Sequence, residues 1–234
     1  MKVLALESSG LTAGAAVLED EVLLAEYTVN YKKTHSQTLL PMLDEISRMI
    51  ELDLNTIDVI AVTAGPGSFT GLRIGSATAK GLGLALNLPI AAVPTVDALA
   101  YNLFGCRDLV CPLMDARRNQ TYTGVYEFGD AGMQILQPQC AVGIDEIVSI
   151  LNQAGRPVVF LGDGVPVFKQ FLAEYCRVPY SFAPPHMNRQ RAASAAALGL
   201  QMAREGRLQS AAEHAPDYLR LSQAERERKE RTGQ

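Results

Sequence analysis

The strongest constraint on the fold is an order of predicted elements that occurs twice along the chain. Each half begins with three short apolar segments of alternating pattern, which predict strands, and continues with an amphipathic helix, a fourth strand and a second helix. The repeat is one of pattern and not of sequence. It predicts an α/β protein built from two similar β-β-β-α-β-α lobes. The opening strands are predicted at 2–6, 14–18 and 22–29 in the first half, and at 109–114, 120–128 and 133–141 in the second.

The other segments of each half have helical periodicity or carry turn residues. In the first half, apolar residues recur at helical spacing from 36 to 52, and a strand at 59–62 leads through a glycine-rich turn into a second helix. A strand at 90–93 and a helix at 95–104 follow. In the second half, the corresponding helix, strand, turn and helix are predicted at 145–153, 158–161, 162–164 and 165–175.

This order divides the chain into three expected parts. We expect an N-terminal lobe over residues 1–104, with helices that bind a partner, and a C-terminal lobe over 105–187. Residues 188–234 are expected to hold an alanine-rich helix, at 188–205, which packs back across the lobes, and a charged tail. The alternating charges at 225–231 predict a solvated helical face or a frayed end.

Acidic residues and glycine turns end corresponding strands in the two halves. The first strand of each half ends in an acid, Glu7 or Asp115, and the fourth strand ends in a glycine turn, at 65–67 or 162–164. Ligands of open α/β sheets bind beyond the carboxyl ends of the strands, so we expect these features to face one cleft. The layout resembles the two-lobed, ribonuclease H-like nucleotide-binding fold of actin, hexokinase and Hsp70.

Five residues of this expected cleft are candidates for nucleotide binding. A glycine-rich turn and a helix N-terminus can hold a phosphate, and carboxylates can hold Mg²⁺ through water. The alternative is structural, with hydrogen-bonded acids and glycines that serve turn geometry. Kinases of this class usually have a glycine after the first acid, where this chain has Ser8 and Ser9, so ATP hydrolysis is not expected. The candidates are Glu7, Gly65, Gly67, Ser68 and Asp115.

Small residues form a stripe along the helix that follows the glycine-rich turn. Gly71, Gly75, Ala79 and Gly83 are spaced four apart and therefore share one face. Each mid-helix glycine costs about 1 kcal/mol relative to alanine, so close packing must compensate for it. The packing partner is either the protein's own sheet or a helix of another subunit. A second row of small residues lies beside the stripe: Ala77, Gly81 and Ala85.

Charge and composition argue against several classes of protein. A net charge of -4 and a pI of about 5.4 give no general attraction to nucleic acid or to an anionic membrane. The short apolar run at the N-terminus predicts no signal peptide and a cytoplasmic protein. The four cysteines lack CxxC spacing and the three histidines are isolated, so no metal or cofactor is expected. His35 is expected to have a capping or surface role.

Longer motifs resemble those of the TsaB family, and the likeness covers nearly the whole chain. The most distinctive is the run Gly-Pro-Gly-Ser-Phe-Thr-Gly-Leu-Arg-Ile-Gly at 65–75. The resemblance implies a subunit of the bacterial machinery that forms threonylcarbamoyladenosine next to the anticodon of tRNAs that read codons beginning with A. The other matching motifs lie at 3–9, 35–43, 93–99, 115–117 and 218–220.

The resemblance also implies that the subunit is not itself an enzyme. TsaB is similar to TsaD, the catalytic subunit, in which two histidines four apart on one helix bind a metal ion. The matching positions here are Thr95 and Leu99, which offer no nitrogen ligand. The label of peptidase that such proteins sometimes carry has no HExxH pair to support it in this chain.

The implied partners are TsaD in a heterodimer, the ATPase TsaE in a larger assembly, and a second copy of the chain in a homodimer. Contact with tRNA is expected only through the complex, and no membrane contact is expected. Two helices from each partner would form a four-helix contact. The expected interface residues are Leu39, Met42, Leu43, Ile46, Met49, Gly71, Leu72, Gly75, Thr78, Ala79 and Leu82.

An alternative function comes from a different class. Glu7, Asp115 and the turn at Gly65 could serve a nucleotide-dependent phosphotransferase or hydrolase of the same superfamily. Turnover of Mg-ATP by the chain alone would distinguish it from a supporting subunit.

Overall fold

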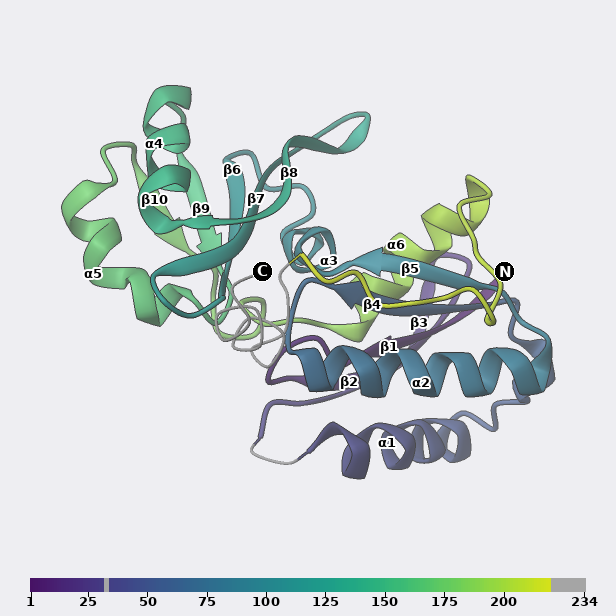
Figure 1. The fold of residues 1–234 in the computed structure, drawn as a ribbon. Helices are drawn as coiled ribbons and strands as arrows, with labels where there is room; N and C mark the ends of the chain where they lie inside the picture. The colour runs from purple at the N-terminus through teal and green to yellow at the C-terminus, as the bar shows by residue number, and fades with distance from the viewer. Residues whose placement is uncertain (32–33, 220–234) are drawn as a thin grey trace.

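The computed structural model describes residues 1–31 and 34–219, which form two five-stranded sheets (Figure 1). The strand order is β3-β2-β1-β4-β5 in the first sheet and β10-β9-β6-β7-β8 in the second. In each sheet three consecutive strands pair antiparallel, and the next strand pairs parallel with the first of them. The predicted α/β fold with two similar lobes is confirmed. The strands are β1 (Lys2–Glu7), β2 (Ala13–Glu19), β3 (Val22–Val29), β4 (Val59–Gly65), β5 (Ile90–Pro94), β6 (Leu109–Asp115), β7 (Gln120–Gly129), β8 (Gly132–Gly143), β9 (Val158–Leu161) and β10 (Tyr180–Phe182).

Helices cover both sheets and follow the predicted order. Within the described ranges, no helix combines the length and apolar character needed to cross a membrane. A 3₁₀ helix, Leu54–Thr56, precedes β4. The α-helices are α1 (His35–Met49), α2 (Phe69–Leu86), α3 (Thr95–Tyr101), α4 (Ile144–Ala154), α5 (Val165–Tyr175) and α6 (Ala192–Arg204).

Several details differ from the sequence predictions. The helices predicted at 36–52 and 95–104 end earlier, at Met49 and Tyr101. Strand β10 was not predicted, because its three residues are too few to show an alternating pattern. Helix α6 begins at Ala192 and not at 188, because Arg191 before it has an extended backbone with φ -135° and ψ 134°. The predicted charged tail at 225–231 lies outside the described residues.

Helices lie on both faces of the first sheet, so its central strands β1 and β4 are buried from two sides, whereas the edge strand β3 is largely exposed. Alternate residues of β1 divide between two cores: Leu4 and Leu6 pack towards α1 and α2, and Val3 and Ala5 pack towards α6. Figure 1 shows α1 and α2 on one side of the sheet and α6 on the other. Helix α6 follows the second sheet in the chain, so residues from beyond the second sheet complete the N-terminal sheet.

Helix α3 shows the converse arrangement, because it belongs to the N-terminal half but packs on the second sheet. It follows the last strand of the first sheet, but Val96, Leu99 and Ala100 pack into a core with side chains of the second sheet, including Tyr126 and Leu161. Helices α4 and α5 cover the other face of the second sheet. The two lobes therefore share helices, and both exchanged helices lie close to the point where the chain passes between them.

The residues after α6 run back along the first sheet, and we call residues 207–219 the C-terminal strap. Gln209 forms a bridge with Ile90 of β5. The ammonium of Lys80 donates hydrogen bonds to the carbonyls of Ala212 and His214, at 2.9 and 2.8 Å. Near its end, the Asp217 N–H donates to the carbonyl of Ala64 at 2.7 Å. The strap thus ends beside the glycine-rich turn that follows β4.

Candidate functional site

The carboxylate of Glu7, at the end of β1, is completely buried. Its Oε1 accepts hydrogen bonds from both the N–H and the hydroxyl of Ser9, each at 2.6 Å, whereas Oε2 has no partner among the described residues. Burial raises the pKa of Glu7 to about 7, against the opposing effect of the Ser9 hydrogen bonds. Glu7 is therefore expected to change its protonation state near neutral pH.

Two buried threonines near these strand ends were not identified from the sequence. Thr63 lies on β4, which pairs with β1, and Thr12 precedes β2. The Thr63 hydroxyl lies beside the Glu7 carboxylate and favours its charged form, whereas the Thr12 hydroxyl has no hydrogen-bond partner within the described ranges. A threonine on a strand is ordinarily a packing residue. Only the folded structure shows which groups surround its hydroxyl.

The loop after β1, Ser8–Gly10, packs directly against the glycine-rich turn. The N–H of Ser68 donates to the carbonyl of Ser9 at 2.6 Å. A Cβ added to Gly67 would overlap with that same carbonyl oxygen, so only glycine allows the two backbones to approach this closely. The Ser68 hydroxyl also accepts from the N–H of Gly71, which caps α2.

Gly65, before the turn, is enclosed by three other parts of the chain. Its φ is +131°, and an added Cβ would overlap with the carbonyl oxygen of Asp217 in the C-terminal strap. Its N–H donates to the hydroxyl of Thr95 at 3.2 Å, and its carbonyl accepts from the amide of Gln139 on β8 at 3.3 Å. The predicted phosphate cradle therefore lies against the C-terminal strap, Thr95 and Gln139, and nucleotide binding there stays a prediction.

The glycine stripe of α2 faces inward. A Cβ on Gly71 would overlap with the Ser8 carbonyl oxygen, and one on Gly75 would overlap with the Ser8 hydroxyl oxygen. A Cβ on Gly83 would lie 2.8 Å from the Cβ of Ala211 in the strap. Of the two alternatives for the stripe, packing within the chain is the one that the structure shows.

The predicted interface list needs a correction for the same reason. Its residues on the inner faces of α1 and α2 are buried in the core of the first lobe, because the apolar face of each helix covers the sheet. Thr78 and Leu82 are partly buried, and Met49 is 75% exposed. The buried residues are Leu39, Met42, Leu43, Ile46, Gly71, Leu72, Gly75 and Ala79.

Asp115 occupies the position in the second sheet that corresponds to Glu7 in the first. Its carboxylate accepts from the Arg117 N–H at 2.8 Å and forms an ion pair with the Arg117 guanidinium at 3.1 Å. Its own N–H donates to the carboxylate of Asp163 at 3.2 Å. Burial raises the pKa of Asp163, and the charge of Asp115 adds to the effect. Asp115 is therefore engaged within its own lobe.

His35 and Gln190 also contact the Ser8–Gly10 loop, both at Gly10. The Nε2–H of His35, the first residue of α1, donates to the carbonyl of Gly10 at 2.8 Å. The side chain of Gln190 is 2% exposed and lies so close to Gly10 that an added Cβ would be 2.9 Å from its Nε2. Neither role has a local sequence signal, because each contact joins residues far apart in the chain. No group of three or more metal-ligating side chains occurs in the described part of the chain.

The arrangement of strands, exchanged helices and glycine turns defines the two-lobed class of actin, hexokinase and Hsp70. A crystal structure of an uncharacterized Pseudomonas aeruginosa protein with similarity to peptidase YeaZ superposes with a TM-score of 0.81 at 25% identity, over 94% of this chain and 99% of that one. The ethanolamine utilization protein EutJ of Carboxydothermus hydrogenoformans shares the fold at 12% identity, with a TM-score of 0.51 over 85% of this chain and 90% of that one.

Sequence comparisons narrow the class to a family. The family model for TsaD, tRNA N6-adenosine threonylcarbamoyltransferase, matches residues 22–228. The tRNA threonylcarbamoyladenosine biosynthesis protein TsaB of Bacillus subtilis is 33% identical over 227 residues, which are 96% of each chain. TsaB of Escherichia coli is 30% identical over 70% of this chain and 72% of that protein. The chain belongs to the TsaB family.

Proposed function

We propose that this chain is a subunit of the machinery that forms threonylcarbamoyladenosine next to the anticodon of tRNAs reading codons that begin with A. Its role there is to bind and support the catalytic subunit TsaD, without catalysing the transfer. The observation that carries this proposal is the family membership, since the likeness to TsaB of Bacillus subtilis extends over 96% of both chains.

The structural roles of two residues support a non-catalytic subunit. Thr95 and Leu99 lie at the positions that match the metal-binding histidines of TsaD. The Thr95 hydroxyl accepts the N–H of Gly65, and Leu99 is fully buried in the core between α3 and the second sheet. Both positions therefore serve the packing of this chain.

The surface proposed for TsaD is the outer face of α1 and α2. The second row of small residues on α2, Ala77, Gly81 and Ala85, is exposed, and a Cβ on Gly81 would meet nothing within 4 Å. Small residues let a second helix backbone approach closely, and the neighbouring apolar side chains would be buried by that approach. A groove of about 550 Å³ lies between β3 and α1. The same two helices also carry exposed apolar side chains: Leu40 (54%) and Met49 (75%) on α1, and Leu84 (64%) on α2. The same face could pair with itself in a homodimer.

A reconstituted modification assay tests the function. With TsaD, TsaE, the other enzymes of the pathway and tRNA present, modification is expected to require this chain, and the Glu7→Gln variant is expected to support it as well as the wild type. Phosphate release from Mg-ATP by the chain alone, lost in that variant, would instead favour the phosphotransferase or hydrolase.

Substitution of Gly81 tests the proposed surface. Gly81→Leu adds bulk to the exposed row and is expected to weaken TsaD binding at least about tenfold, the equivalent of about 1.4 kcal/mol. Its thermal stability should not fall, because leucine is a better helix former than glycine. Calorimetric titration with TsaD measures the affinity. Ala154→Leu, on the exposed end of α4 in the other lobe, is the matched control. Equal affinities for the two variants would show that TsaD does not bind the exposed face of α2.

A further inference from the structure

The chain passes between the lobes twice. It leaves the first sheet through α3 and residues 102–108, and it returns from the second sheet through residues 183–191. Asn102, at the C-cap of α3, begins the outgoing connection and is 7% exposed. In proteins whose lobes move, the hinge lies in such connections, where a few residues absorb the change in backbone angles.

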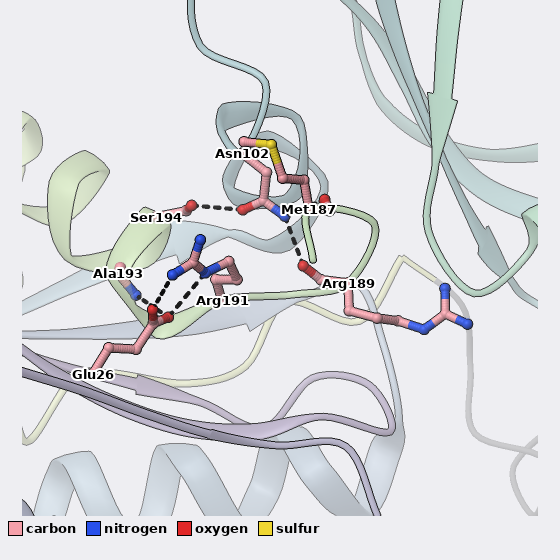
Figure 2. A network of polar contacts seen from close by, with 7 residues as sticks. All are labelled: Glu26, Asn102, Met187, Arg189, Arg191, Ala193 and Ser194. Atoms are coloured by element: carbon pink, nitrogen blue, oxygen red, sulfur yellow. Dashed lines mark hydrogen bonds and ion pairs between the residues drawn. The ribbon is translucent and has the colours of Figure 1, made fainter. Parts of the chain in front are cut away.

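The side chain of Asn102 joins the two connections. Its Nδ2 donates to the carbonyl of Met187 at 2.9 Å and to the carbonyl of Arg189 at 2.6 Å, both in the returning connection. Its Oδ1 accepts the hydroxyl of Ser194 in α6 at 2.6 Å. Figure 2 shows this amide between the returning segment and the start of α6. One buried amide thus uses both of its donors and its acceptor to hold the two connections together.

The residues between these contacts are held by other elements. The carbonyl of Asn188 accepts the N–H of Gly162, which follows β9 in the second sheet, at 3.1 Å. The next residue but one, Gln190, packs against Gly10 beside the first sheet. Met187 and Arg189 therefore bind to Asn102 at the end of α3. Between them, Asn188 binds to the second sheet, and after them Gln190 packs beside the first sheet.

Glu26 fixes the end of the returning connection to the first sheet. Its carboxylate, on β3, accepts hydrogen bonds from the guanidinium of Arg191 and from the N–H of Ala193 at 3.2 Å (Figure 2). Arg191 is the N-cap residue of α6. The start of the exchanged helix is thus held by an ion pair and by a bond to one of its free N–H groups.

Two further side chains of the second sheet bind to α3 or to the first sheet. The hydroxyl of Tyr126 on β7 donates to the carboxylate of Asp97 on α3 at 2.7 Å. Gln139 on β8 accepts the N–H of Val96 at 3.4 Å and donates to the Gly65 carbonyl at 3.3 Å. Rotation of one lobe against the other would break these bonds together with those of Asn102.

We propose that Asn102 locks the two connections, so that the lobes behave as one rigid body with no hinge between them. Hinge opening would have to break both Nδ2 hydrogen bonds of Asn102, and their loss disfavours the open state. The device belongs to this chain by itself and does not depend on the proposed function.

Distances between spin labels on the two lobes test the lock. Labels are attached in the full chain to cysteines placed at Glu45 on α1 and Gln153 on α4, both exposed. Cys106, Cys140 and Cys176 are replaced by serine, and the buried Cys111 is kept. Electron–electron double resonance should give a single narrow distance distribution. Asn102→Ala should broaden or shift it, while Ser194→Ala, which leaves both Nδ2 bonds in place, should leave it narrow.

Each outcome bears on the proposal. A broad or two-peaked distribution in the labelled protein that keeps Asn102, with native circular dichroism, overturns it, and this result does not require the Asn102→Ala variant to fold. A distribution that stays narrow in a folded Asn102→Ala protein, with native circular dichroism, also overturns it, because another contact would then hold the lobes. Broadening in Asn102→Ala and not in Ser194→Ala supports the lock.

Discussion

Replacing Gly71 with alanine is expected to lower the free energy of unfolding by about 2 kcal/mol. A Cβ at this position would overlap with the backbone carbonyl of Ser8, so the cost is expected at the upper end of the usual overpacking range, about 3 kcal/mol. Alanine returns about 1 kcal/mol of helix propensity. The expected loss is the difference between these two effects, and urea unfolding measures it.

Gly81→Ala is the matched control because it lies on the same helix. An added Cβ there meets nothing within 4 Å, so only the propensity gain remains, and the variant should be more stable than the wild type by about 1 kcal/mol. Substitution by alanine is therefore expected to lower the free energy of unfolding at Gly71 and to raise it at Gly81. If both substitutions stabilise the protein, the contact between α2 and the Ser8–Gly10 loop is not as close as described.

The second large expected effect is a pH-dependent increase in the free energy of unfolding of the Glu7→Gln variant. The pKa of Glu7 is raised from 4.5 to about 7 in the folded state, so the fold favours its neutral form. Its stabilising contribution is fully present below pH 4.5 and is lost as the pH rises through 7, for a total of about 3 kcal/mol. Glutamine is neutral at every pH and avoids this loss.

Unfolding free energies at a series of pH values reveal the effect as a difference between two proteins. The variant and the wild type should be similar near pH 4.5, and by pH 8 the Glu7→Gln protein should be more stable by about 3 kcal/mol. Glu45→Gln, which removes an exposed carboxylate on α1, controls for the change in net charge. A constant difference across this range would show that Glu7 does not titrate in it.

Much of the fold could be predicted from the sequence because its signals are local. The alternating and helical periods predicted the strands, the helices and the repeated order, and the glycines at 65–67 predicted the turn. The elements that were not predicted correctly are short or are set by contacts between residues far apart in the chain. Three residues of β10 carry no period, and the extended backbone before α6 is imposed by contacts with Asn102 and Glu26.

The candidate site was predictable only in part. The ends of strands identified Glu7 and the turn, but the sequence could not show that Glu7 is buried with one unpaired oxygen. Spacing shows that the small residues of α2 share a face, yet it does not show whether that face meets the protein's own sheet. Gln139 and Gln190 act across long separations in the chain, and an isolated glutamine in a sequence carries no signal for such a contact.

The exchange of α6 and the C-terminal strap has a consequence for synthesis on the ribosome. When residue 104 has been translated, the first sheet has α1 and α2 on one face, but the helix that covers Val3, Ala5 and Ala61 on the other face does not yet exist. That apolar face stays bare until residues 192–204 emerge. The N-terminal half therefore cannot mature ahead of the rest, and a truncated product carries an exposed surface by which quality control can distinguish it from the finished protein.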